Sequence, residues 1–201
     1  MEGGFGVDQT RAHVTRLLGE LQDGNAAVLD ELFALLYEEL RTIAHRQRRR
    51  WQGDDTLDTT ALVHEAYLKL VGQARIGVES RAHFFALAAK AMRHILCNYV
   101  RERSAQKRGG GLERLPLDEC KAVSPQIALP PEPADTLLAL DDALRRLEQI
   151  DPRQSKVVEC RFFGGLTIEE TATAIGVSPR TVRRDWSVAQ AWLHREMKSH
   201  V

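Results

Sequence analysis

The residues of this sequence best suited to chemistry are arginines gathered on one side of a segment near the C-terminus. Apolar residues recur there at steps of four, three and four, at Val182, Trp186, Ala189 and Leu193, which is the spacing of one buried helix face. The residues of the same segment that we expect to contact DNA are Ser178, Arg180, Thr181, Arg183, Arg184 and Ser187. Guanidinium and hydroxyl groups presented in this way bind base edges and phosphates in the major groove of DNA. The segment therefore predicts a DNA-recognition helix.

The residues before this segment predict the rest of a helix-turn-helix. Thr167 and Glu170 have the spacing of a capping box, in which each side chain accepts a hydrogen bond from the other residue's backbone. Gly176 permits a left-handed turn, and Ser178-Pro179 caps and opens the next helix. The alternative is an ordinary helical hairpin with a solvated basic face. It would require the two caps, the glycine turn and the one-sided arginines to coincide by chance.

The charged residues are unevenly distributed, although the chain is neutral overall with 28 basic and 28 acidic residues. Residues 1–40 hold eight acidic and two basic side chains, whereas basic side chains gather in 41–50, 93–108 and 180–184. Because phosphate binding depends on local rather than net charge, zero net charge is compatible with DNA binding.

No residue pattern supports catalysis, a metal site or a cofactor. His64-Glu65 lacks the second histidine of a zinc-protease motif, and no glycine-rich phosphate loop follows a strand. Cys97, Cys120 and Cys160 show neither metal spacing nor an even disulfide framework, so we expect three buried, reduced thiols. No apolar run is long enough to span a membrane, and the N-terminus lacks a signal pattern. We expect a cytoplasmic protein that is not an enzyme and does not bind membranes.

The apolar spacing predicts the elements that position these groups: an all-α fold of two small helical domains joined by a flexible linker. We expect the first domain over residues 1–108, the glycine- and proline-containing linker over 109–134, and the helix-turn-helix domain over 135–201. Helices are predicted over 8–21, 25–50, 60–71 and 80–108, then from about 135, with a restart at Asp151-Pro152, an N-cap followed by proline.

Three stretches of the sequence resemble the extracytoplasmic-function (ECF) subfamily of sigma-70 RNA polymerase sigma factors. "LEQIDPRQSKVVECRFFGGLTIEETATAIGVSPRTVRRDWSVAQAWL" is similar to the C-terminal domain of that family. "LDTTALVHEAYLKLV" resembles its polymerase-binding helix, and "FFALAAKAMRHILCNYVRERSAQKRG" resembles its promoter-melting helix. The likeness covers nearly the whole chain in the family's order. It implies core RNA polymerase and promoter DNA as partners.

The resemblance also implies a role for particular residues. The C-terminal recognition helix would bind the −35 element, and the long fourth helix would bind and open the −10 element. The residues that occupy the −10-reading stretch are Arg93, His94, Asn98, Arg101 and Arg103, with His94 the candidate for an unstacked base. The residues that would bind the core polymerase are Asp58, Leu62, Val63, Glu65 and Lys69.

Two departures from the family pattern carry further expectations. Asp185 lies in the recognition helix, where it would repel a phosphate, so we expect it to pair with a neighbouring arginine. An acidic pair common before the polymerase-binding helix is replaced by Thr60-Ala61. Because phosphothreonine restores about −1.5 to −2 charge, and a helix N-terminus favours anions, we hypothesise activation by a Ser/Thr kinase at Thr60, with Thr59 or Thr56 as alternates. These threonines acting only as helix caps are the other interpretation.

A helix-turn-helix regulator that acts without core polymerase is the alternative function. It would bind duplex DNA tightly by itself and would carry a sensory N-terminal domain. The N-terminal half lacks the strand–helix alternation of a receiver domain, and sensing does not explain its basic fourth helix. An anti-sigma factor is a second expected means of control.

Overall fold

The computed structural model describes residues 4–52, 59–72, 77–78, 80–108 and 131–198, and every regular element in these ranges is a helix. This confirms the expected all-α class. The N-terminal half consists of α1 (Gly4–Gln22), η1 (Ala26–Val28), α2 (Leu29–Leu35), α3 (Tyr37–Gln52), α4 (Thr59–Val71) and α5 (Arg81–Arg108). The C-terminal half consists of α6 (Pro131–Ile150), α7 (Pro152–Val158), η2 (Glu159–Phe163), α8 (Ile168–Ile175) and α9 (Pro179–Lys198). No helix among these ranges combines the length and the hydropathy that crossing a membrane would need.

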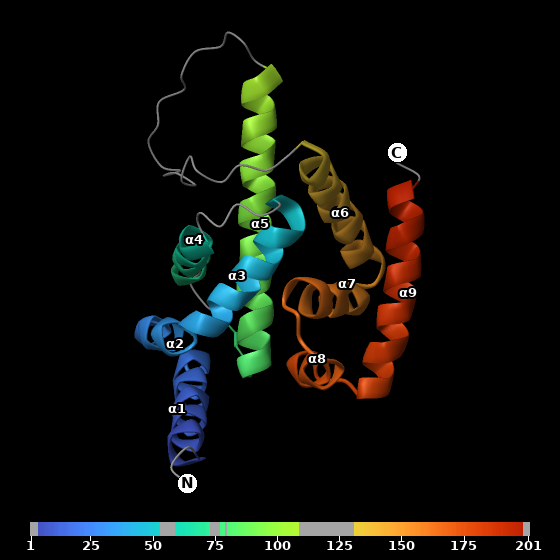
Figure 1. Cartoon of the computed structure of the whole chain (residues 1–201). Helices are drawn as coiled ribbons and strands as arrows, with labels where there is room; N and C mark the ends of the chain where they lie inside the picture. Colours follow the sequence, from blue (N-terminus) through green and yellow to red (C-terminus); the bar gives the residue numbers. More distant parts are fainter. Residues whose placement is uncertain (1–3, 53–58, 73–76, 79, 109–130, 199–201) are drawn as a thin grey trace.

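The long helix α5 lies at the centre of the molecule (Figure 1). α4 packs on one side of it, α6, η2 and α8 pack on the other, and α3 crosses α5 and contacts both α4 and α6. Of the apolar residues that recur along α5 at helical spacing, Phe84, Ala91 and Ile95 are buried and Leu87 and Tyr99 are half-buried. Further side chains around the helix are buried as well: Phe85, Ala88, Ala89, Met92, Leu96, Cys97 and Val100. A helix that is apolar on most of its circumference belongs in an interior, and α5 fills that place.

The chain between residues 25 and 50 corrects one prediction. A single helix was expected, but the structure has η1, α2 and α3 in succession, with a break at Leu36. The backbone N–H of Leu36 donates to the Leu32 carbonyl, and the Leu36 carbonyl accepts from Leu40, so the break leaves these groups paired. Leu32 and Leu40, on either side of the break, are both 0 % exposed. The change of axis lets both segments bury their apolar residues, which outweighs the continuity of one helix.

The local signals of the C-terminal half are confirmed by the structure. Asp151 caps α7 by accepting hydrogen bonds from the backbone N–H groups of Arg153 and Gln154. Thr167 and Glu170 form both hydrogen bonds of the capping box at the start of α8. Gly176 ends α8 with a left-handed φ of 67°, a conformation that costs glycine least.

The two halves pack against each other. One continuous cluster of buried side chains includes Leu96 of α5 and Leu140 of α6, together with Phe163 of η2. α6 begins at Pro131, four residues before the predicted start of the second domain, because proline is favoured in a first helical turn. The remainder of the predicted linker, residues 109–130, lies outside the described residues, and the division into two separate domains stays a prediction.

Candidate nucleic-acid interface

The turn after α8 directs α9 so that its basic face points to solvent. Val182, Ala189 and Leu193 are buried as expected, and Trp186 is half-buried. Five of the six predicted polar side chains are exposed, namely Ser178, Arg180, Arg183, Arg184 and Ser187, and Thr181 is half-buried. The sequence prediction of a two-sided helix is therefore confirmed, and three arginines are presented within its first two turns.

The hydroxyl groups on α9 have local roles in this structure. Ser178 Oγ accepts a hydrogen bond from the backbone N–H of Thr181 at 3.1 Å, which caps the helix start, and the two hydroxyls lie 2.9 Å apart. Ser187 Oγ donates to the carbonyl of Arg183 at 3.0 Å. The first bond orders the helix start and the second occupies the Ser187 hydroxyl within the helix, so the arginines are the principal exposed groups that can reach a nucleic acid.

Asp185 forms the pair that the sequence predicted, and it forms a second one as well. Its carboxylate, which is 2 % exposed, accepts hydrogen bonds from Arg184 Nε and Nη2 at 3.1 Å. Arg153 Nε, from α7, donates to the other oxygen at 2.6 Å. Burial favours a higher pKa for Asp185, but the two arginine hydrogen bonds outweigh it and hold this pKa below its ordinary value. The acidic residue thus fastens α9 to α7, a role that sequence reasoning missed for Arg153.

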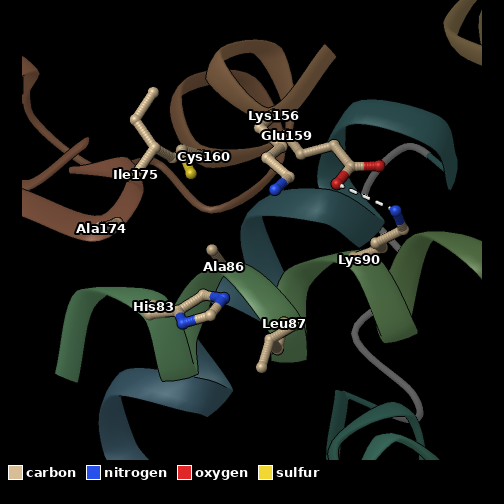
Figure 2. A pocket seen from close by; sticks show the side chains of 9 residues that line it. All are labelled: His83, Ala86, Leu87, Lys90, Lys156, Glu159, Cys160, Ala174 and Ile175. Atoms are coloured by element: carbon tan, nitrogen blue, oxygen red, sulfur yellow. Dashed lines mark ion pairs between the residues drawn. The ribbon is translucent and has the colours of Figure 1, made fainter. Parts of the chain in front are cut away.

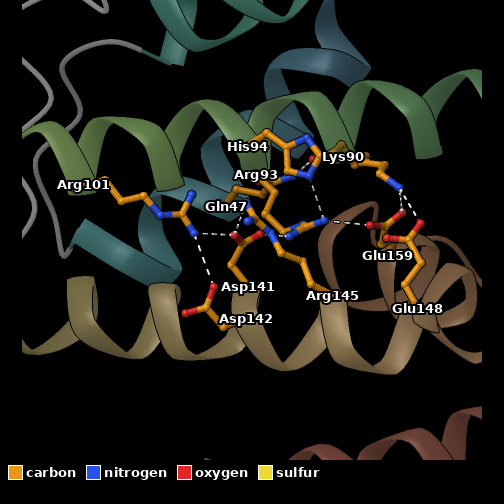
Figure 3. Close-up of polar contacts among 11 residues, drawn as sticks. Gln47, Lys90, Arg93, His94, Arg101, Asp141, Asp142, Arg145, Glu148 and Glu159 are labelled. Atoms are coloured by element: carbon orange, nitrogen blue, oxygen red, sulfur yellow. Dashed lines mark hydrogen bonds and ion pairs between the residues drawn. The ribbon is translucent and has the colours of Figure 1, made fainter. Parts of the chain in front are cut away.

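The residues of α5 that were predicted to read the −10 element are placed differently. Arg93 is 3 % exposed and forms ion pairs with Asp141 of α6 and with Glu159 of η2, the latter at 2.7 Å (Figure 3). Arg101 donates to Asp141 at 2.7 Å. The Asp141 carboxylate is 0 % exposed and is also contacted by Arg145 at 3.0 Å. Burial favours a higher pKa for Asp141, yet the Arg101 hydrogen bond and the surrounding arginines hold this pKa below its ordinary value.

His94 lies half-buried beside these ion pairs. Burial, followed by the positive charges of Arg93 and Lys69, lowers its pKa from 6.5 to about 4. The imidazole is therefore neutral at physiological pH and able both to donate and to accept a hydrogen bond. Asn98 is exposed on the same helix, whereas the side chain of Arg103 lies outside the described residues.

Side chains of α3 donate hydrogen bonds to backbone carbonyls of η2, of the residue that follows η2, and of α5. Arg50 Nη1 donates to the Phe162 carbonyl at 2.8 Å, and its guanidinium lies 3.7 Å from the centre of the Phe162 ring. Arg46 Nη1 donates to the Gly164 carbonyl at 3.3 Å. Gln47 Nε2 donates to the carbonyl of Ala89 at 3.0 Å. Sequence reasoning recognised Arg46 and Arg50 only as part of a basic run, because carbonyl acceptors more than a hundred residues away leave no local signal.

The predicted polymerase-binding residues of α4 divide into two groups. Leu62 and Val63 are 0 % and 3 % exposed and belong to the core, so they position the helix. Glu65 and Lys69 are half-buried. The exposed apolar side chains of this helix are Leu68 and Val71, which sequence reasoning did not select. Asp58 lies outside the described residues.

The candidate phosphorylation sites are also distinguished by burial. Thr60, the second residue of α4, is exposed. Thr59 is buried, and its Oγ1 accepts a hydrogen bond from Arg48 Nη1 at 3.5 Å. Thr56 lies outside the described residues. Among the described candidates, only Thr60 has a hydroxyl that a kinase could reach.

Two further observations concern binding of small groups. A cavity of about 230 Å³ opens between α5, α7, η2 and α8, and one wall carries the ion pair between Lys90 and Glu159 at 3.5 Å (Figure 2). Cys160 lines the cavity, and burial raises its pKa to about 12. Burial likewise raises the pKa of Cys97 to about 12, so both thiols hold their protons at neutral pH. Both are buried, as expected. Cys120 lies outside the described residues.

Within the described ranges no cluster of His, Cys, Asp or Glu is placed to hold a metal ion.

Comparison with known proteins identifies a family relationship. The family model described as ECF sigma factor matches residues 11–199 of the chain. The match therefore includes α4 and α5 of the N-terminal half and α8 and α9 of the C-terminal half. No curated protein and no solved structure matches the chain.

Proposed function

Because the chain belongs to the ECF sigma factor family, we propose that it is an alternative sigma factor that binds core RNA polymerase and directs transcription initiation at specific promoters. The observation that carries this proposal is the match over residues 11–199, and the exposed arginines of α9 support it. A family of this kind acts in transcription and not in catalysis.

α9 supplies the contacts with duplex DNA in this proposal. Its N-terminal half would enter the major groove of the −35 element, where guanidinium groups bind guanine edges in a bidentate manner. Arg183 and Arg184 lie on the exposed face for this task, and Arg180 is placed at the helix start, where a phosphate is favoured. The pairing of Arg184 with Asp185 fixes the direction of that guanidinium.

α5 supplies the contacts with the opened strand of the −10 element. A basic track with flat polar side chains holds single-stranded DNA by its phosphates and its unstacked bases. Arg93, Arg101 and Arg103 would hold phosphates, and Asn98 and the neutral His94 would bind a base. The polymerase would dock on α4, through Glu65 and Lys69 together with the exposed Leu68 and Val71.

Transcription in vitro tests the proposal directly. Core RNA polymerase is mixed with the purified protein on a pooled promoter library, and we expect specific transcripts that are lost with the Arg183→Ala/Arg184→Ala variant. Arg16→Ala, which removes an exposed arginine of α1, is the matched control and should retain them. An absence of transcripts, together with tight and sequence-specific binding of the protein alone to duplex DNA, would establish the helix-turn-helix regulator instead.

Control of polymerase docking is the finer part of the proposal. Phosphorylation of Thr60 by a Ser/Thr kinase would place about −1.5 to −2 charge at the exposed N-terminus of α4, where the helix dipole favours anions. This would restore the negative charge that the Thr60-Ala61 pair lacks. The buried Thr59 would have to bring a phosphate into the core, which is strongly unfavourable.

Binding to core polymerase distinguishes the modes of control. We expect Thr60→Glu and Thr60→Asp/Ala61→Asp to bind the core enzyme more tightly than the unmodified protein and Thr60→Ala. Thr42→Glu, which adds the same charge at an exposed position of α3, is the control. Equal affinity for all forms would overturn the phosphorylation proposal, and full transcription by the unmodified protein would point to an anti-sigma factor as the controlling partner.

A further inference from the structure

The arginines of α5 that are proposed to hold DNA are occupied by carboxylates of the same chain. Arg93 is enclosed by Asp141 and Glu159, and Arg101 reaches Asp141 at 2.7 Å and Asp142 at 3.6 Å. Figure 3 shows these side chains pointing toward each other from α5 on one side and from α6 and η2 on the other. Carboxylates and phosphates bind a guanidinium by the same bidentate, charge-assisted hydrogen bonds. One group of arginines cannot serve both at once.

The ion pairs between α5 and the C-terminal half include buried side chains as well as exposed ones. Arg93 and Asp141 are 3 % and 0 % exposed. Lys90 extends the row by pairing with Glu148 at 3.4 Å and with Glu159 at 3.5 Å. All the acidic partners belong to the C-terminal half, and all the basic partners from the other half lie on α5, so the charges are sorted across the boundary between the halves.

A second set of contacts holds the same boundary from α3. Arg50 binds the Phe162 carbonyl and stacks on the Phe162 ring, and Gln47 lies within 3.5 Å of the Phe163 carbonyl. We call the two sets together, the α5 carboxylate pairs and the α3 carbonyl contacts, the seam. The exposed arginines of α9 take no part in it.

The seam also carries an unfavourable component. Arg93 Nε and Gln47 Oε1 are buried without a hydrogen-bond partner among the described residues. Unsatisfied buried polar atoms and desolvated charges oppose the packing that buries them. Opening the seam would return these atoms to water, so the closed arrangement is one that a competing ligand can displace.

We propose that the C-terminal half acts as an intramolecular inhibitor of α5, with Asp141 and Glu159 in the position of DNA phosphates, so that the free protein presents its −35 helix while its −10 helix is masked. This inference rests on the proposed role of α5 in DNA binding. Docking on the polymerase and binding of the opened strand would then replace the two carboxylates by phosphates. The neutral net charge of the chain is consistent with an inhibitor of this kind, because the chain has as many acidic as basic residues.

The test compares variants of the full chain by their affinity for fluorescent random-sequence single-stranded DNA and by small-angle X-ray scattering. Asp141→Asn/Glu159→Gln removes the masking charges with nearly isosteric side chains. Glu20→Gln/Glu31→Gln, which neutralises two partly exposed carboxylates of the N-terminal half, is the control for the same change in net charge. Phe162→Ala weakens the seam from the α3 side without changing any charge.

We expect the Asp141→Asn/Glu159→Gln variant to have a larger radius of gyration and at least tenfold tighter DNA binding than the wild type. Phe162→Ala should shift both quantities in the same direction by a smaller factor, and the control should shift affinity less than threefold. Unchanged scattering and affinity in both seam variants would overturn the proposal. An opened variant whose DNA affinity matches the control would overturn the masking, whatever the transcription assay gives.

A chemical cross-link tests the wild-type protein without any substitution. A zero-length carbodiimide joins Lys90 to Glu148 when the seam is closed, because amine and carboxylate lie 3.4 Å apart, and peptide mapping identifies the product. The cross-linked protein cannot open its seam, so it should bind single-stranded DNA no more tightly than the untreated protein. Cross-linked protein that binds as tightly as the Asp141→Asn/Glu159→Gln variant would contradict the proposal. If the wild type gives no transcripts but the seam variants show the expected scattering and DNA affinity, the masking holds and only the sigma-factor role is contradicted.

Discussion

The arginines of α9 and those of α5 come from similar sequence patterns but have opposite surroundings. Both helices carry basic side chains beside an apolar stripe, and both resemble DNA-binding helices of the same family. On α9, Arg183 and Arg184 remain exposed, with Glu169 and Asp185 as their respective partners. On α5, Arg93 is enclosed by carboxylates that are 48 and 66 residues distant in sequence.

This difference shows what an amphipathic pattern does and does not determine. The pattern states which face of a helix is apolar, but it does not state whether the polar face meets water or another part of the chain. An exposed ion pair contributes little to stability, whereas removing one partner of a buried pair leaves an uncompensated charge. The two helices should therefore respond very differently to the same arginine-to-alanine substitution.

The largest difference is expected between Arg93→Ala and Arg183→Ala. Removing Arg93 leaves Asp141 and Glu159 buried together, which costs on the order of 3–5 kcal/mol of unfolding free energy. Arg183 is 61 % exposed and lies 3.6 Å from Glu169, so its loss should cost no more than about 0.5 kcal/mol. Urea denaturation followed by circular dichroism measures both. Equal losses would show that the α5 pairs contribute no more than a surface contact.

An intermediate effect is expected at Asp185, which is the one buried acidic residue of α9. Asp185→Ala removes the acceptor of Arg153 and Arg184, whose side chains are partly exposed and can turn to water. We expect a loss of about 2 kcal/mol. Thr173→Ala at an exposed position of α8 is the control, and urea midpoints compare the two. A loss below that of the control would mean that the link to α7 does not hold the recognition helix.

The low pKa of His94 on α5 predicts that the stability of the folded protein depends on pH. Its pKa is about 4 in the folded protein and about 6.5 in an unfolded chain, so below pH 6.5 the unfolded chain binds a proton that the folded protein does not. Stability should therefore fall as pH falls from 6.5 to 4 and then level off. We expect about 1–2 kcal/mol, less than the full shift implies, because the ring is only half-buried.

Two measurements check this expectation. Urea midpoints between pH 7 and pH 4 should fall for the wild type and change less for His94→Gln. Nuclear magnetic resonance of the ring protons should give a titration midpoint near 4, and a midpoint near 6.5 would contradict the burial of this ring beside Arg93. The low pKa values of Asp141 and Asp185 act in a separate window, since their stabilisation is lost only as pH falls below the ordinary carboxyl range.

The parts of the fold that the sequence predicted are those set by neighbouring residues. The capping box at Thr167, the turn at Gly176 and the proline start after Asp151 all depend on residues within a few positions, and the structure has each of them. The break at Leu36 and the enclosure of Arg93 depend on packing partners far along the chain. Composition and periodicity contain no information on such partners, so one helix was predicted where there are two.

The candidate site divides in the same way. The exposed face of α9 follows from spacing alone, because its apolar residues leave only one face for the arginines. The roles of Arg153 and Arg50 required knowledge of which carboxylate or carbonyl lies opposite. For α4, Leu62 and Leu68 lie six positions apart and so on different faces of the helix, and Leu62 is buried whereas Leu68 is exposed; spacing does not state what an exposed leucine contacts.

The smallest expected loss of stability is at the capping box of α8, which the sequence predicted correctly. Thr167 Oγ1 accepts a hydrogen bond from the backbone N–H of Glu170 at 3.1 Å, and the Glu170 carboxylate accepts from the backbone N–H of Thr167 at 2.8 Å. Thr167→Ala breaks the first bond and should cost about 1 kcal/mol. Thr173→Ala on the same helix changes the same residue type outside the cap, where alanine is the better helix former.

The difference between these two variants in urea denaturation isolates the cap from the effect of losing a threonine. We expect Thr167→Ala to be destabilised and Thr173→Ala to be neutral or slightly stabilised. If both behave alike, the start of α8 is held by its packing on α7 and α9 and not by its own capping residues. In that case, even the part of the molecule that was read correctly from local sequence would depend, like α5, on contacts that only the folded chain provides.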